Sequence, residues 1–152
     1  MDLILWRHAE AEDLAAGSDL QRELTRRGER QAARMAEWLR RHLPDDARIL
    51  CSPARRCEQT VRALRRQYQL ADELAPGASV DEVLGAAQWP GDGETVLVVG
   101  HQPTLGAVVA RLLQMRDTDC TVRKGGVWWL RTREHDGRQQ ATVVAVQSPD
   151  LL

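Results

Sequence analysis

Three short apolar runs divide this chain into units of strand followed by helix. The runs are DLILWR at 2–7, RILC at 48–51 and TVLVVG at 95–100. Each is almost unbroken in apolar residues, which is typical of strands that are covered on both faces of a parallel sheet. Parallel neighbours need a crossover connection, normally a helix, so this feature restricts the fold to the α/β class.

The segments that follow these runs have the periodicity of amphipathic helices. Thr25 is a suitable N-cap for a helix that ends near Pro44, within which apolar residues recur at spacings of three and four. Ser52 and Pro53 are expected to cap and begin a second helix, and a third is expected to begin at Pro103. Strand and helix therefore alternate through the first two thirds of the chain.

The last part of the chain has a different pattern. A stretch rich in Pro, Gly and acidic residues at 72–94 contains one expected short helix at 79–88. The runs at 126–133 and 141–147 alternate or are β-branched, as strands do, and the turn sequence HDGR separates them. We therefore predict a three-layer α/β/α sandwich that has a mostly parallel sheet and an antiparallel C-terminal edge hairpin, as one domain over residues 1–152.

Overall charge and hydropathy exclude several classes of partner. The 152 residues carry 21 Lys and Arg against 22 Asp and Glu, a formal net charge of -1, which leaves no basic footprint for nucleic acid. No run approaches the roughly 18 apolar residues of a membrane span, and the first apolar run is too short and too acidic for a signal peptide. We expect a cytoplasmic monomer without nucleic-acid or membrane partners, whose cysteines (Cys51, Cys57 and Cys120) are reduced thiols.

Chemically reactive side chains collect directly after the three predicted strands. They are Arg7 and His8 after the first, Ser52 and Arg55 or Arg56 after the second, and His101 and Gln102 after the third. In an open α/β sheet, ligands bind beyond the carboxyl ends of the strands, where helix N-termini present unpaired N–H groups. Arginine's planar fork binds phosphate oxygens, and a neutral imidazole is a competent nucleophile toward phosphorus. The sequence therefore predicts a phosphate pocket at this edge.

Helical periodicity separates the two adjacent arginines of the second helix. Arg55 shares a solvated face with Gln59 and Arg62, whereas Arg56 flanks the apolar face together with Thr60. We therefore expect Arg56, and not Arg55, to point into the pocket.

Four ordered motifs resemble the histidine phosphatase superfamily. LWRHAEAE at 5–12 resembles its Arg-His-Gly motif, with Ala9 in place of the glycine, and SPARRCEQT at 52–60 is similar to its Ser-Pro-x-x-Arg-Ala-x-Gln-Thr segment. VVGHQPTL at 98–105 resembles the segment that carries the second catalytic histidine. The chain length, the alanine and RELTRRG at 22–28 look most like the small branch of bacterial phosphohistidine phosphatases.

The resemblance implies a role for each strand-end residue. His8 would be the neutral nucleophile that becomes transiently phosphorylated, while Arg7, Arg56 and a protonated His101 would hold the phosphoryl group. Further contacts to substrate phosphate are expected from two less strongly indicated residues, Arg22 and Gln102. Because these groups supply the positive charge, neither a metal ion nor another cofactor is expected.

The weakest part of the resemblance concerns the proton donor. Larger members of the superfamily supply a glutamate from long insertions, and this chain has only the short 72–94 stretch, in which DELAP makes Glu73 the candidate acid. An imidazole leaving group needs less protonation than an alkoxide. The expected substrate is therefore a phosphohistidine on a protein, either a phosphotransfer domain or a phosphotransferase-system carrier, and a small phosphorylated molecule is the alternative.

Other functions fit the sequence less well. A cysteine-dependent phosphatase needs a catalytic cysteine that is followed, after five intervening residues, by an arginine. The residues at that position after the three cysteines are Cys57, Ala63 and Gly126, so this class of enzyme is excluded. A metal site built from His8, Glu10, Glu12 and Asp13 lacks HExxH spacing, so solvated carboxylates are the preferred interpretation. A small-molecule phosphatase or mutase, and a non-catalytic phosphate-binding module, remain alternatives on the same pocket.

Overall fold

A six-stranded sheet in the order β3-β2-β4-β1-β5-β6 forms the centre of the computed structural model, which describes residues 1–13, 17–118 and 120–152. The strands are β1 (Asp2–Arg7), β2 (Arg48–Cys51), β3 (Gln69–Leu70), β4 (Thr95–Gly100), β5 (Val127–His135) and β6 (Arg138–Gln147). The first four pair in parallel, whereas β5 is antiparallel to both β1 and β6. The predicted mostly parallel sheet with an antiparallel C-terminal edge is confirmed.

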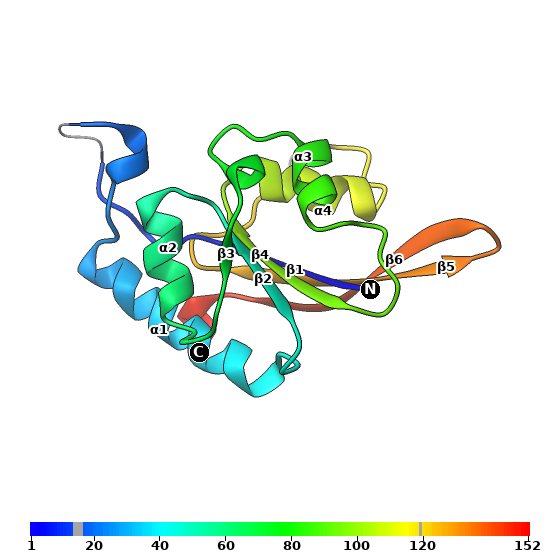
Figure 1. The fold of residues 1–152 in the computed structure, drawn as a ribbon, viewed down its shortest axis with the longest axis horizontal. Coiled ribbons are helices and arrows are strands. Elements are labelled where there is room, and N and C mark those ends of the chain that lie inside the picture. Colours follow the sequence, from blue (N-terminus) through cyan, green and yellow to red (C-terminus); the bar gives the residue numbers. More distant parts are fainter. Residues whose placement is uncertain (14–16, 119) are drawn as a thin grey trace.

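Helices cover both faces of the sheet, α1 and α2 on one face and α3 and α4 on the other (Figure 1). They are α1 (Arg26–His42), α2 (Arg55–Arg62), α3 (Val80–Ala86) and α4 (Thr104–Leu112). The alternation of side chains along β1 produces this layering, because Ile4 and Trp6 pack under α1 and α2 while Leu3 and Leu5 pack under α3 and α4. The predicted three-layer α/β/α architecture is therefore confirmed.

The start of α1 is fixed by its cap and by a close approach to the chain beyond β1. Thr25 is the N-cap, as predicted, and its side-chain oxygen accepts a hydrogen bond from the Gly28 amide at 2.9 Å. A β-carbon at Gly28 would collide with the carbonyl oxygen of Glu10. Glycine at this position therefore lets the helix lie directly against the segment that follows His8.

The second helix begins later than predicted. Its N-cap is Ala54 and its first residue is Arg55, so the prediction that Ser52 and Pro53 cap and begin it was wrong. The Ser52 hydroxyl instead accepts from the Ala54 amide at 3.2 Å and faces His101. The helix stops at Arg62, and Arg65 adopts a positive φ of 55°, which redirects the chain into the exposed two-residue strand β3.

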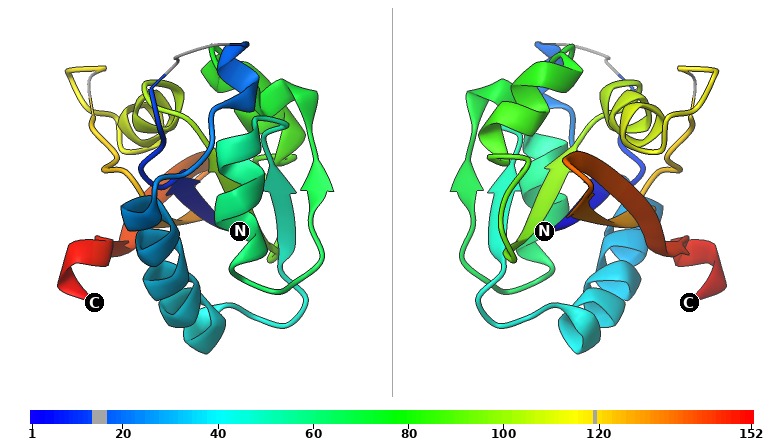
Figure 2. Two further views of the ribbon diagram at one scale, coloured as in Figure 1. Left: turned by 90° about the vertical axis from the view of Figure 1, so that its left-hand side faces the viewer. Right: turned by 90° about the vertical axis from the view of Figure 1, so that its right-hand side faces the viewer.

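The remaining elements follow the predictions closely. Ser79 caps α3 and Pro103 is the N-cap of α4. The C-terminal hairpin is longer than predicted, since β5 and β6 continue to a two-residue turn at Asp136 and Gly137, both with positive φ. The hairpin extends past the ends of its neighbours, and the C-terminal turn η3 (Pro149–Leu151) lies beside α1 (Figures 1 and 2).

Two further observations concern the cysteines and membrane spans. Cys51 and Cys57 are buried, and all three cysteines are free thiols, as predicted. Within the described ranges, none of the helices has the length and apolar character needed to span a membrane.

Candidate active site

Parallel register brings the two strand-end histidines together. Arg7 pairs with Gly100 as the last step of the β1–β4 ladder, and the His8 amide continues that ladder by donating to the Gly100 carbonyl at 3.1 Å. The Ser52 amide similarly donates to Val99 at 3.0 Å, which places the end of β2 at the same level. The rings of His8 and His101 consequently lie 5.3 Å apart, centroid to centroid.

His8 is oriented by the backbone of the residue that follows it. Its Nδ1 lies 2.8 Å from the Ala9 carbonyl oxygen. Because a carbonyl oxygen only accepts, Nδ1 carries the proton and Nε2 keeps its lone pair, to which Arg56 Nε donates at 3.3 Å. Burial, with smaller contributions from the charges of Arg56 and Arg7, lowers the pKa of His8 from 6.5 to about 4. The ring is therefore neutral at pH 7.

Arg56 faces both histidines from the first turn of α2. Besides its contact with His8, its Nη2 lies 3.3 Å from His101 Nδ1, and its side chain is only 4% exposed. Arg55 is exposed and forms an ion pair with Glu23 at 2.6 Å. The prediction that Arg56 and not Arg55 points into the pocket is confirmed.

His101 is held in a neutral form between two groups. Arg56 donates to Nδ1, so Nε2 carries the proton and donates it to the Ser52 hydroxyl at 2.7 Å. Burial, followed by the electrostatic interactions with His8 and with the Arg56 guanidinium, lowers the pKa of His101 to about 3. Burial and the neighbouring cations therefore disfavour the charged form of His101, whereas the expected protonated His101 is one that holds a phosphoryl group.

Arg7 leaves part of its guanidinium available to an anion. Its Nη1 donates to the Val122 carbonyl at 3.0 Å, which fixes the side chain against the segment that leads into β5. Its buried Nε has no hydrogen-bond partner within the described part of the chain. A buried cationic donor of this kind is energetically costly unless an acceptor is bound.

These side chains line one cavity of about 190 Å³. The lining residues are Arg7, His8, Ala11, Asp13, Arg22, Arg56, Pro76, Gly77, His101, Gln102 and Lys124. The predicted anion contact Arg22 is therefore at the site, and it is held by the Glu12 carbonyl, to which Arg22 Nε donates at 2.7 Å. Sequence reasoning did not assign Lys124, the only lysine of the chain, to this cavity.

Gln102 lines the cavity, but its side chain is engaged with backbone. Its Nε2 donates to the Cys120 carbonyl at 2.6 Å, and its Oε1 accepts from the Gly106 amide at 3.1 Å. These contacts connect the first turn of α4 to the segment before β5. The side-chain amide of Gln102 therefore supports the cavity wall, and its predicted contact with phosphate has no support from this geometry.

Glu73, the predicted proton donor, does not line the cavity. It is exposed in the short turn η2 (Asp72–Leu74), whereas Pro76 and Gly77 of the same segment reach the cavity wall. Among the described residues of the lining, Asp13 brings a carboxyl group to the cavity. The geometry therefore gives Glu73 no contact through which to protonate a leaving group bound at His8.

Asp19 is a further residue of the site that sequence reasoning missed. Its carboxylate accepts hydrogen bonds from Arg56 and from Arg22, each at 3.1 Å. Asp19 lies in the connection after β1, where no periodicity or motif distinguishes one acidic residue from another. Only its position beside the two arginines identifies it.

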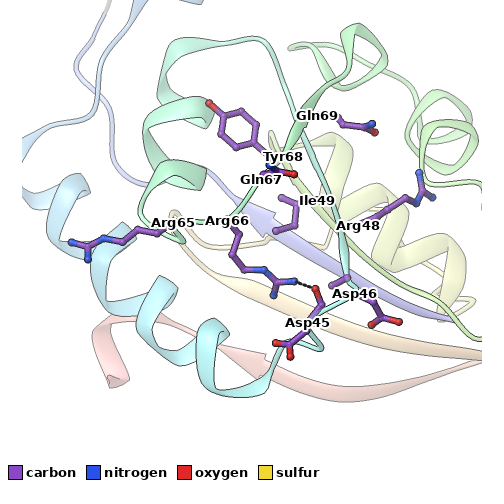
Figure 3. Close-up of a pocket in the computed structure, with 10 residues that line it drawn as sticks. Asp45, Asp46, Arg48, Ile49, Arg65, Arg66, Gln67, Tyr68 and Gln69 are labelled. Carbon is purple, nitrogen blue, oxygen red and sulfur yellow. Dashed lines mark hydrogen bonds between the residues drawn. The ribbon is translucent and has the colours of Figure 1, made fainter.

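A larger hollow lies elsewhere. It has a volume of about 860 Å³ and lies between the start of β2 and residues 65–69 (Figure 3). There Arg66 donates to the carbonyls of Pro44 and Asp45 at 2.9 and 2.7 Å and so closes the loop before β2. Neither histidine lines this hollow, so we assign the active site to the smaller cavity.

A metal site is not formed by the acidic residues after β1. Glu10 accepts a hydrogen bond from Thr25 at 2.9 Å and lies 3.7 Å from Arg27, so its carboxylate belongs to the start of α1. Across the ranges that the structure describes, His, Cys, Asp and Glu side chains form no group of three or more that could hold a metal ion.

Comparison with known proteins identifies the family. Residues 3–79 match the model of the histidine phosphatase superfamily, branch 1. This chain belongs to that superfamily. It is therefore a phosphatase of the histidine phosphatase type, and the resemblance stated from the four motifs is confirmed.

Within the superfamily, the chain resembles the SixA branch. It is 34% identical to the phosphohistidine phosphatase SixA of Escherichia coli K12 over 120 residues, which cover 74% of each chain. The solved structure of the protein histidine phosphatase SixA in complex with tungstate has a TM-score of 0.83 against this chain, at 28% identity and 99% coverage of both chains. Mycobacterial glucosyl-3-phosphoglycerate phosphatase shares the fold at 19% identity (TM-score 0.68, 95% and 97% coverage).

Proposed function

We propose that this phosphatase hydrolyses phosphohistidine on a protein through a covalent phospho-His8 intermediate. The observation that carries the proposal is the geometry of His8. Its Nδ1–H is bound to the Ala9 carbonyl, and its unprotonated Nε2 faces the cavity beside Arg56 and His101. A neutral nucleophile held in one tautomer, next to cationic donors, suits attack on a phosphoryl group.

In the first step, His8 Nε2 forms a bond to phosphorus while the phosphorus–nitrogen bond of the substrate breaks. The electron pair of that bond stays on the departing nitrogen, and the substrate ring leaves as neutral imidazole because its other nitrogen carries a proton. Arg7 and Arg56, which line the cavity together with His8, stabilise the equatorial phosphoryl oxygens. The charge of these oxygens also favours protonation of His101, opposite to the effect of the neighbouring cations.

In the second step, water attacks the phosphorus of phospho-His8. The phosphorus–nitrogen bond to His8 breaks, orthophosphate leaves, and Nε2 regains its lone pair. The same arginines stabilise this second transition state, because the equatorial oxygens occupy the same place in both steps. The arginines supply the positive charge, so we propose that neither step requires a metal ion.

The substrate class follows from the leaving group and from the size of the site. Imidazole leaves with little assistance, so a site whose predicted acid Glu73 lies outside the cavity lining suits phosphohistidine better than a sugar phosphate. The small cavity of about 190 Å³ fits a side chain presented by a protein surface. Similarity to SixA proteins, named as phosphohistidine phosphatases, supports the same choice.

The proposed partners are a phosphotransfer domain of a signal-transduction pathway or a phosphotransferase-system carrier. We propose that the chain meets them in the cytoplasm and acts as a monomer. The alternative substrate is a small phosphorylated molecule, as in the glucosyl-3-phosphoglycerate phosphatase that shares the fold.

A comparison of three substrate classes with one enzyme preparation tests the proposal. The substrates are a phosphohistidine protein, a phosphoserine peptide and a set of sugar phosphates, and the measured quantity is kcat/KM, with a His8→Ala preparation as the blank. We expect the phosphohistidine protein to be preferred by at least about 100-fold. Equal values, or a preference for a sugar phosphate, would overturn the substrate assignment.

A further inference from the structure

The guanidinium of Arg56 has two edges, and each faces a different partner. Its Nε and Nη2 lie 3.3 Å from His8 Nε2 and His101 Nδ1. On the other edge, Nη1 donates to the Asp19 carbonyl at 2.8 Å and Nη2 donates to the Asp19 carboxylate at 3.1 Å. Asp19 thus binds the edge of the Arg56 guanidinium that does not face the histidines.

The same carboxylate also holds a second arginine of the cavity. The other carboxylate oxygen of Asp19 accepts from Arg22 Nη1 at 3.1 Å. Arg22 and Arg56 both line the cavity, whereas Asp19 itself is absent from the lining. One carboxylate behind the cavity wall therefore connects two cationic side chains that come from separate segments of the chain.

Electrostatics alone gives no reason for a carboxylate at this position. A negative charge next to two anion-binding arginines lowers the local positive potential and opposes the binding of phosphate. The side chain of Asp19 is 46% exposed, so its ion pairs contribute little to the stability of the fold. The remaining benefit of Asp19 is that it orients the two arginines. A hydrogen-bond donor that is already oriented need not reorganise when negative charge develops on the phosphoryl oxygens.

We propose that Asp19 is a positioning residue that fixes Arg56 and Arg22 so that the Nε and Nη2 edge of Arg56 meets the phosphoryl oxygens. This inference rests on the proposed function for the identity of the substrate, but not for the binding of phosphate. Asp19 touches neither the substrate nor the nucleophile and acts through the two arginines.

The test is the affinity of the protein for inorganic phosphate, measured by NMR titration, which reaches millimolar dissociation constants and reports the fold in the same spectra. We expect Asp19→Ala to weaken phosphate binding by about tenfold, although it removes a negative charge. Asp19→Asn keeps an acceptor oxygen and should stay within about threefold of the parent. Asp81→Ala, which removes an exposed ion pair with Arg111, is the matched control. Tighter or unchanged binding in Asp19→Ala would overturn the proposal.

A second arm tests whether Asp19 acts through Arg56. In an Arg56→Ala background, the additional effect of Asp19→Ala on phosphate affinity should shrink to about twofold or less, because the oriented group is gone. An undiminished tenfold effect in that background would contradict the proposal. These titrations need no turnover and can be repeated on His8→Ala, so a failure of the proposed phosphatase mechanism would be seen separately.

Discussion

The Nδ1 atom of His8 lies 2.8 Å from the carbonyl oxygen of Ala9, so the nucleophile is oriented by the backbone of its own neighbour. The Ala9 amide in turn donates to the Thr60 hydroxyl at 3.1 Å, and that hydroxyl donates to the Arg56 carbonyl at 2.7 Å. The nucleophile and the principal arginine are therefore connected through one threonine on α2.

Substitution of His8 by alanine should abolish turnover and leave the binding of phosphate partly intact. The arginines that bind the anion remain, but no group can accept the phosphoryl group, so kcat should fall by on the order of 10³-fold or more. Single-turnover assays and phosphate titrations measure the two effects. His135→Ala, on the exposed end of the C-terminal hairpin, should have parent activity. Substantial turnover by His8→Ala would disprove the nucleophile assignment.

Arg56 and Arg55 form a matched pair of neighbours with different surroundings. Arg56→Ala should reduce kcat/KM by about 100-fold or more, since a buried donor to the transition state is lost. Arg55→Ala removes an exposed ion pair with Glu23 and should change kcat/KM by less than about threefold. Steady-state kinetics of both variants give the comparison, and the reverse ranking would contradict the geometry.

The depressed pKa of His8 predicts both its own titration and the pH dependence of stability. NMR titration of the ring, assigned with His8→Ala, should give a pKa near 4 rather than 6.5. Between these values the unfolded chain binds more protons than the folded one, so the free energy of unfolding should fall as the pH is lowered from 6.5 toward 4.

Denaturant unfolding at pH 7 and pH 5 measures that loss of stability. Replacement of His8 by glutamine removes the titrating group, so this variant should lose less stability between the two pH values. A parent protein with the same unfolding free energy at pH 7 and pH 5 would show that burial does not depress the pKa of the histidines as the structure indicates.

Removal of divalent metal ions should leave turnover unchanged within experimental error. In the proposed mechanism the positive charge comes from Arg7, Arg56 and a His101 that gains a proton when phosphate binds, and these groups do not depend on chelatable ions. The measurement is the rate after extended dialysis against EDTA, compared with the rate after re-addition of Mg²⁺, Mn²⁺ or Zn²⁺. A rate that falls on dialysis and recovers with one metal would reopen a role for the carboxylates near His8.

Gly28 should tolerate no side chain, because a β-carbon there collides with the Glu10 carbonyl oxygen. Gly28→Ala should lower the free energy of unfolding by about 1–3 kcal/mol and displace the segment after His8, with a loss of activity. Gly85 offers the control, since a β-carbon there meets no atom within 4 Å. Gly85→Ala in α3 should stabilise the protein by up to about 1 kcal/mol. Denaturant unfolding of both variants tests this contrast.

Local patterns in the sequence determined the layers of the fold and much of the site. Continuous apolar runs indicated β1, β2 and β4, and helical phase alone separated Arg56 from Arg55. Strand ends in a parallel sheet share one edge, so the proximity of His8 and His101 also followed from the order of elements. The strands and the phase of α2 depend on residues close together in the chain, which is why periodicity reveals them.

Only the tertiary structure decided the contacts that join distant segments. The place of Glu73 outside the cavity and the neutral state of His101 depend on burial and on which groups from other segments lie nearby. Asp19 lies 37 residues from Arg56 in the chain, in a segment without periodicity, and their ion pair exists because folding places that segment beside Arg56. Local sequence patterns do not predict such long-range contacts, because the two partners belong to different segments of the chain.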